Sequence, residues 1–144
     1  MRIGILIFAG VHALEVGGAL DVFYKAAQLA HQPAAYQFDL IGLQQGPVRA
    51  SNGMLFQPTC TIDAAPHDID TLLLPGGMQL HEKAARQRLI HWLVLQTAVV
   101  RRLRSISSGT LLRALSMVEE DLGAQVASQT ARELMIIPER PIRV

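Results

Sequence analysis

The sequence predicts an α/β protein in which a parallel sheet carries helices on both faces. Short apolar runs rich in β-branched residues, of which Ile3–Phe8 is the clearest, alternate with longer segments of helical periodicity. Apolar runs of this length without polar alternation are typical of strands that are buried on both faces. Glycines at Gly10 and Gly76-Gly77 follow two of the runs and mark the turns out of the sheet. In such folds, ligands bind at the carboxyl ends of the strands.

The first half of the chain supplies three predicted strands. After Ile3–Phe8, residues 14–30 have helical periodicity, with Leu20, Phe23, Ala27 and Ala30 on one face. A second strand is expected over residues 36–43, and Asn52-Gly53 predicts a hairpin turn after it. The third strand covers residues 70–74 and ends at Pro75.

The second half is predicted to add one strand and three helices. A long helix is expected over residues 79–103, a short strand over 104–107 and a helix over 110–122 that Gly123 terminates. The last helix, over residues 124–137, stops at Pro138. The core face of the long helix is expected to hold Leu89, Trp92, Leu93, Leu95 and Val99.

Length and composition indicate one domain with a large apolar core. The chain has 144 residues, half of them hydrophobic, and a formal net charge of +1. A balanced charge argues against direct binding of nucleic acid. Arg101 and Arg102 belong to the densest basic cluster, which we interpret as a solvated face. We expect residues 1–137 to form the domain and residues 138–144 to be a tail or linker stub.

No cofactor, metal or membrane contact is expected from the sequence. Cys60 is the only cysteine, so an internal disulfide is impossible and a reducing, cytoplasmic location fits. The five histidines lack the spacings of metal sites. The most apolar helical segment, residues 89–100, is shorter than the about 20 residues that span a bilayer.

Two turns at strand ends are able to present backbone N–H groups to an anion. Pro75-Gly76-Gly77 ends the third strand, and Ser107-Ser108-Gly109 joins the fourth strand to a helix. A residue at a strand-to-helix elbow is thrust into a pocket, while the next N–H and the helix dipole stabilise negative charge. Ser107 occupies that elbow position, and the two turns together resemble an oxyanion hole.

The chain resembles the ThiJ/PfpI branch of the class I glutamine amidotransferase-like superfamily. The resemblance is closest to the amidase-like sensor domains of AraC-type transcription regulators, and it covers nearly the whole chain. The motifs that carry it, in order, are Ile3–Val11, Leu14-Glu15-Val16, Leu20–Phe23, Leu72–Gly77, Ile106–Gly109, Ser116–Gly123 and Ala131–Leu134.

The resemblance implies a three-layer, flavodoxin-like sheet and a set of site residues. The acidic residue after the first strand falls on Glu15, the amide of the glycine turn on Gly77, and the elbow position on Ser107, with the Ser108 N–H as a second amide. Gly76 and His81 are expected beside them in the pocket. Taken alone, Glu15 also fits a buried, hydrogen-bonded carboxylate without a role in binding.

The chain departs from the family pattern in ways that bear on activity. The family's elbow cysteine is serine here, and an unassisted hydroxyl is a poor nucleophile. The segment that carries the family histidine, between the elbow helix and the closing helices, is missing, which predicts a truncated version of the fold.

Three functions remain open at this point. The first is a non-catalytic or weakly catalytic sensor domain that binds a small amide, amine or carboxylate. The second is a hydrolase or hydratase, similar to isonitrile hydratases and PfpI-type peptidases, that uses Ser107 with Glu15. The third is a degenerate structural domain that forms homodimers, because the missing segment leaves an unpaired sheet edge. The apolar positions nearest that segment, among which a dimer contact is expected, are Val99, Ile106, Leu111, Leu115, Met117 and the last helix.

Overall fold

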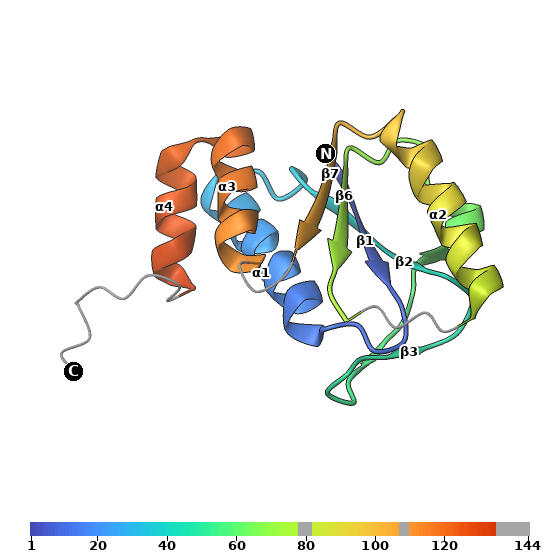
Figure 1. Cartoon of the computed structure of the whole chain (residues 1–144). Coiled ribbons are helices and arrows are strands. Elements are labelled where there is room, and N and C mark those ends of the chain that lie inside the picture. The colour runs from blue at the N-terminus through green and yellow to red at the C-terminus, as the bar shows by residue number, and fades with distance from the viewer. Residues whose placement is uncertain (78–81, 107–109, 135–144) are drawn as a thin grey trace.

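A five-stranded, all-parallel sheet forms the centre of the protein. The computed structural model describes residues 1–77, 82–106 and 110–134 (Figure 1). Every pair of neighbouring strands in this sheet runs parallel. In spatial order the strands are β5 (Cys60–Thr61), β2 (Gln37–Gly42), β1 (Arg2–Ile7), β6 (Thr71–Pro75) and β7 (Arg102–Ile106).

Helices cover both faces of the sheet, as predicted. On one face lie α1 (Ala13–Leu29), α3 (Thr110–Leu122) and α4 (Ala124–Glu133), and on the other lies α2 (Lys83–Thr97) (Figure 1). The chain moves from β1 to β2 in one direction and from β6 to β7 in the other, so right-handed crossovers place α1 and α2 on opposite faces. The three-layer, flavodoxin-like arrangement is therefore confirmed.

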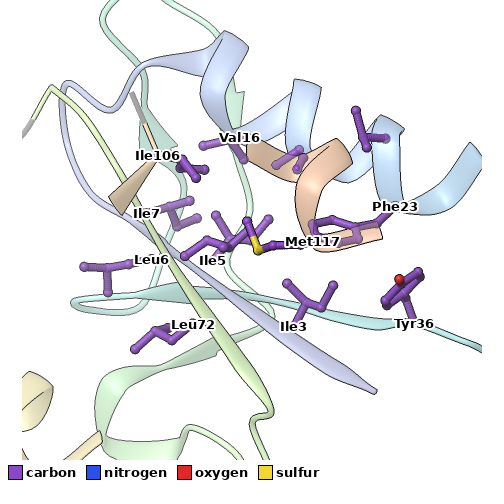
Figure 2. Packing of buried hydrophobic residues seen from close by; sticks show 14 of the residues in the cluster. Ile3, Ile5, Leu6, Ile7, Val16, Phe23, Tyr36, Leu72, Ile106 and Met117 are labelled. Carbon is purple, nitrogen blue, oxygen red and sulfur yellow. The ribbon is translucent and has the colours of Figure 1, made fainter. Parts of the chain in front are cut away.

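The core lies mainly between the sheet and the face that carries α1 and α3. Ile3, Ile5 and Ile7 of β1 point toward Phe23 of α1 and Met117 of α3, and all five side chains are buried (Figure 2). Because side chains alternate along a strand, Leu6 points to the opposite face. Residues Ile3 to Ile7 of β1 are buried without exception, which explains why this strand reads as an unbroken apolar run.

Between β2 and β6 the chain forms smaller elements. The antiparallel hairpin of β3 (Val48–Arg49) and β4 (Leu55–Phe56) surrounds the predicted Asn52-Gly53 turn. The short strand β5 and the 3-10 helix η1 (Ile62–Ala64) follow it, and neither is evident from the sequence pattern because each has only two or three residues.

The long helix is shorter than predicted. It ends at Thr97, and β7 begins at Arg102, whereas the sequence favoured a helix as far as Leu103. Pairing of β7 with β6 outweighs helix propensity here, because Arg102 to Ile106 are needed opposite Thr71 to Pro75. Of the expected core face, Leu89 is buried and Trp92 and Leu93 are partly buried, but Leu95 and Val99 are exposed.

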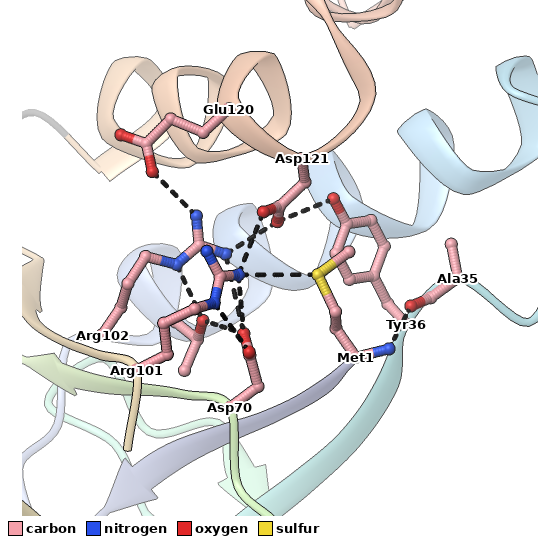
Figure 3. Close-up of polar contacts among 9 residues, drawn as sticks. Met1, Ala35, Tyr36, Asp70, Arg101, Arg102, Glu120 and Asp121 are labelled. Carbon is pink, nitrogen blue, oxygen red and sulfur yellow. Dashed lines mark hydrogen bonds and ion pairs between the residues drawn. The ribbon is translucent and has the colours of Figure 1, made fainter.

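A polar cluster at the amino-terminal edge of the sheet ties β7 to α3. Arg102 is 4 % exposed and donates to Asp121, which is 2 % exposed, over 2.7 Å (Figure 3). Arg101 also reaches Asp121 at 3.1 Å, and Tyr36 donates its hydroxyl to the same carboxylate. Burial, with Asp121 nearby, raises the pKa of Tyr36, so the hydroxyl keeps its proton. The interpretation of this basic cluster as a solvated face is therefore wrong for Arg102.

The apolar positions proposed for a dimer contact divide into two groups. Ile106, Leu115 and Met117 are buried in the chain's own core and are not available to a partner. Val99 is exposed, and Leu111 is partly buried. Within the described ranges, β7 has a strand neighbour on one side only, so it forms an edge of the sheet.

Over the residues that the structure describes, no helix combines the length and the apolar character needed to cross a membrane.

Candidate ligand site at the carboxyl edge of the sheet

The two central strands define where a ligand is expected. β1 and β6 are neighbours, yet the helices that follow them cover opposite faces of the sheet. Diverging connections of this kind open a crevice beyond the carboxyl ends of the two strands, which is the usual ligand position in open α/β sheets. The segments Gly10–Glu15 and Gly76-Gly77 lie at this crevice.

Backbone contacts fix the two turns against each other. Gly10 and Gly77 have φ angles of +83° and +94°, which favour glycine. A Cβ atom on Gly77 would lie 2.3 Å from the Gly10 carbonyl oxygen, so no larger residue fits there without displacing backbone. The His12 N–H donates to the Gly76 carbonyl over 3.1 Å, and the Gly10 N–H donates to the Arg49 carbonyl over 2.9 Å.

Glu15 connects the first turn of α1 to the glycine turn. Its side chain is only 10 % exposed. The Gly76 N–H donates to Oε2, and Oε1 lies 3.1 Å from Nδ1 of His12. An ionised carboxylate is an acceptor only, so these two contacts use both of its oxygens. Helix α1 also favours an acidic side chain in its first turn.

The imidazole of His12 lies over the glycine turn. A Cβ atom on Gly76 would approach its Nδ1 to 3.2 Å, and one on Gly77 would approach its Cδ2 to 2.9 Å. The ring therefore occupies space that side chains at both positions would need. With 51 % of its side chain exposed, His12 is accessible to a small molecule from solvent.

The structure brings three of the predicted site residues together. Glu15, Gly76 and Gly77 meet at the end of β6, but the Gly76 N–H is donated to Glu15. Gly76 therefore holds the carboxylate, and the expectation of an amide that contacts the ligand rests on Gly77. Ser107, Ser108 and His81 lie outside the described residues. The last described residue of β7, Ile106, pairs with Pro75, so β7 ends beside the glycine turn.

Sequence reasoning did not identify His12. Its signal is the spacing of three residues to Glu15 at the start of the helix that follows the first strand, which places both side chains on one helix face. The spacings that indicate metal sites join histidines or cysteines to one another, so they do not detect a pair of one histidine and one glutamate. Over the described ranges, the structure has no group of three or more histidine, cysteine or acidic side chains placed to hold a metal ion.

A pocket opens at the ends of β1 and β2, and its lining includes neither Glu15 nor the glycine turn. Its volume is about 400 Å³, within the range of small-molecule sites. Its polar groups come from Gln44, Gln45, Arg49 and Glu82. Its lining residues are Ile7, Phe8, Ala9, Leu43, Gln44, Gln45, Gly46, Pro47, Val48, Arg49, Glu82 and Ala85.

Comparison with known sequences points to one family. The model of the DJ-1/PfpI family matches residues 1–130. A protein encoded in the cpoL 5′ region of Streptomyces lividans, which is described as uncharacterized, is 34 % identical over 76 residues. That match covers 53 % of this chain and 51 % of the relative, so the chain spans about half the length of the curated relative.

Solved structures with the same fold include a transcription regulator and members of the ThiJ/PfpI and DJ-1 group, all of low sequence identity. An AraC family transcriptional regulator from Pseudomonas putida is 17 % identical, with a TM-score of 0.72 over 92 % of this chain and 98 % of that one. A ThiJ/PfpI family protein from Pseudomonas syringae is 14 % identical, with a TM-score of 0.76 over 99 % and 77 %. DJ-1beta of Drosophila melanogaster is 16 % identical, with a TM-score of 0.65 over 93 % and 97 %.

Proposed function

Since the chain belongs to the DJ-1/PfpI family, as a ThiJ/PfpI domain, we propose that it senses a small molecule and has little or no catalytic activity. The ligand would bind at the carboxyl edge of β1 and β6. The proposal also places the protein in the cytoplasm and takes residues 1–137 as the domain.

The observation that carries the proposal is the constellation of His12, Glu15, Gly76 and Gly77. It joins a buried carboxylate, an accessible imidazole and a fixed glycine turn at the crevice where open α/β sheets bind ligands. Ser107, which follows β7 in the sequence, is a serine, so the thiolate chemistry of a cysteine at that position is not available to this chain.

Likeness to a regulator supports sensing over turnover. The similar structure from Pseudomonas putida is described as an AraC family transcriptional regulator. By analogy, this domain would report on a metabolite to a DNA-binding unit, because its own nearly balanced charge does not favour direct binding of DNA.

Ligand-induced stabilisation is the direct test. A ligand that binds only the folded state at 100 times its dissociation constant adds about 2.7 kcal/mol to the free energy of unfolding. We expect members of a library of small amides, amines and carboxylates to raise the thermal midpoint of the wild type. Glu15→Gln should lose this response, whereas the control Asp21→Asn, an exposed site on the same helix, should keep it. A library without any hit on the wild type would contradict sensing.

One observation supports the alternative function of a hydrolase or hydratase. The imidazole of His12 supplies a candidate base, which the sequence analysis had not identified at this edge. We still expect Ser107 to react with a fluorophosphonate no faster than Ser105 or Ser108. Rapid labelling of Ser107 that is lost in His12→Gln would favour the enzyme.

We further propose that the protein is a homodimer. A groove of about 430 Å³ runs between α1, the β3–β4 hairpin and the start of α3. Leu14 and Met54, both exposed, line it, and among the described residues a Cβ atom on Gly17 would meet nothing outside its own helix within 4 Å. An open glycine between exposed apolar side chains suits close approach of a second copy. If the protein binds no ligand, we propose the third function, a structural domain that forms homodimers.

A further inference from the structure

The contacts of Glu15 determine which nitrogen of His12 carries a proton. The Gly76 N–H donates a hydrogen bond to Oε2 of Glu15, and Nδ1 of His12 lies 3.1 Å from Oε1 of Glu15. An ionised carboxylate has no proton to donate, so the hydrogen of this second contact must come from the imidazole. A neutral ring with Nδ1–H has an unprotonated Nε2, which is an acceptor.

This acceptor belongs to a side chain that is half exposed. Among the described residues, none forms a hydrogen bond with Nε2. We propose that His12 is the ligand-contacting acceptor of the site and that Glu15 is its positioning residue. The pair then selects amide or amine ligands, which donate N–H, over carboxylates. This inference rests on the sensing function proposed above.

The preference follows from what a carboxylate would meet. Its oxygens would face the lone pair of Nε2 and, behind the ring, the charge of Glu15. A polar group that loses water without gaining a partner costs about 1–3 kcal/mol. An amide of the same size donates to Nε2 and avoids this cost, so we expect at least about fivefold weaker binding of the carboxylate.

The tautomer of His12 tests the pair without any ligand. Long-range proton–nitrogen correlation on the ¹⁵N-labelled protein distinguishes Nδ1–H from Nε2–H, and the exposed His31, His67 and His91 serve as internal references. We expect Nδ1–H for His12. In Glu15→Gln the amide oxygen still accepts from Gly76, and the new NH₂ faces Nδ1, so the tautomer should switch to Nε2–H. The control Asp21→Asn should leave it unchanged. An Nε2–H tautomer in the wild type, or no switch in Glu15→Gln, would overturn the inference.

Selectivity is tested with three probes of matched size: propionamide, propylamine and propionate. Titration followed on the His12 ring signals should show that the amide and the amine bind the wild type at least about fivefold more tightly than propionate. Glu15→Gln, whose ring presents Nε2–H, should lose this preference. Binding of propionate to the wild type as tight as that of propionamide would refute the ligand class. If none of the three binds, sensing itself fails, whereas the tautomer still decides the role of the pair.

Discussion

At the residue scale, the glycine turn is defined by what it excludes. Gly77 combines a φ of +94° with a Cβ position 2.3 Å from the Gly10 carbonyl oxygen. Gly46 has a similar φ of +99°, but within the described part of the chain a Cβ atom there meets nothing beyond its chain neighbours within 4 Å. An alanine at either position would suffer backbone strain, but only an alanine at Gly77 would also clash with neighbouring backbone.

We predict that Gly77→Ala costs clearly more stability than Gly46→Ala. Left-handed backbone costs a non-glycine residue about 1–2 kcal/mol, which both variants share. Displacing backbone to make room adds about 1–3 kcal/mol, and only Gly77→Ala requires it. Denaturant unfolding of both variants measures the difference. Equal losses would mean that the two turns move apart easily and do not form a fixed site.

The sequence revealed only part of this site. Glycines and Glu15 were identifiable because turn chemistry and the family pattern mark them. His12 was not identifiable, because its role depends on the position of its ring over Gly76 and Gly77, which are more than 60 residues away in the sequence. For the same reason, donation of the Gly76 N–H to Glu15 follows only from tertiary structure.

At the scale of elements, the contact between β7 and α3 depends on one buried ion pair. Arg102 donates to Asp121 inside the protein, and to Glu120 at its rim, where the carboxylate is 54 % exposed. Arg101 and Tyr36 also donate to Asp121. These donors make Asp121 the centre of the cluster, although the sequence gives no sign that this one acidic residue of α3 is buried.

Asp121→Asn is predicted to destabilise the protein by about 3 kcal/mol, because it removes the buried carboxylate and leaves the buried Arg102 guanidinium with the half-exposed Glu120 as its close charged partner. Glu120→Gln is the matched control, and its loss should stay below about 1 kcal/mol, as for other exposed pairs. Denaturant midpoints with unchanged slopes are the measurement. Similar losses in the two variants would show that Arg102 shifts readily to Glu120.

Asp70 makes the same edge sensitive to acid. Arg101, which donates to Asp70 over 2.8 and 2.9 Å, holds the pKa of this carboxyl below its ordinary value of 3.8. A lowered pKa in the folded state contributes stability above the unfolded pKa, and this contribution is lost as the pH falls through the folded pKa. We expect the stability gap between the wild type and Asp70→Asn to be constant from pH 7 to about 5 and to narrow below about 4. A gap that does not change with pH would contradict this role.

At the scale of the whole molecule, the pattern of strands and helices was predictable and its boundaries were not. The parallel sheet follows from the apolar runs, because each strand buried on both faces must lack polar alternation. The end of α2 at Thr97 does not, since residues 98–103 suit a helix as well as a strand, and the pairing of Arg102 and Leu103 with β6 is a tertiary contact. A short strand such as β5 is defined by its pairing with β2, and this pairing cannot be predicted from two residues of sequence.

Assembly is the remaining property at this scale, and three surfaces compete for it. The β7 edge is short and carries the exposed Arg104, and charged side chains on an edge strand oppose pairing. The exposed apolar residues Ile90, Val94 and Leu95 on α2 form a second candidate. The groove beside α1 is concave and apolar and includes the open Gly17, which is why it is the favoured contact.

We therefore predict that Leu14→Lys dissociates the dimer and that Val94→Lys does not. Both replace an exposed apolar side chain by a lysine, so they differ only in the surface that they alter. An interface of this kind should bury more than about 1,000 Å², and a central residue contributes about 2 kcal/mol or more, so Leu14→Lys should weaken association at least about thirtyfold. Light scattering over a dilution series gives the dissociation constants. A wild type that stays monomeric at all concentrations would refute the dimer, and dissociation by Val94→Lys alone would move the contact to α2.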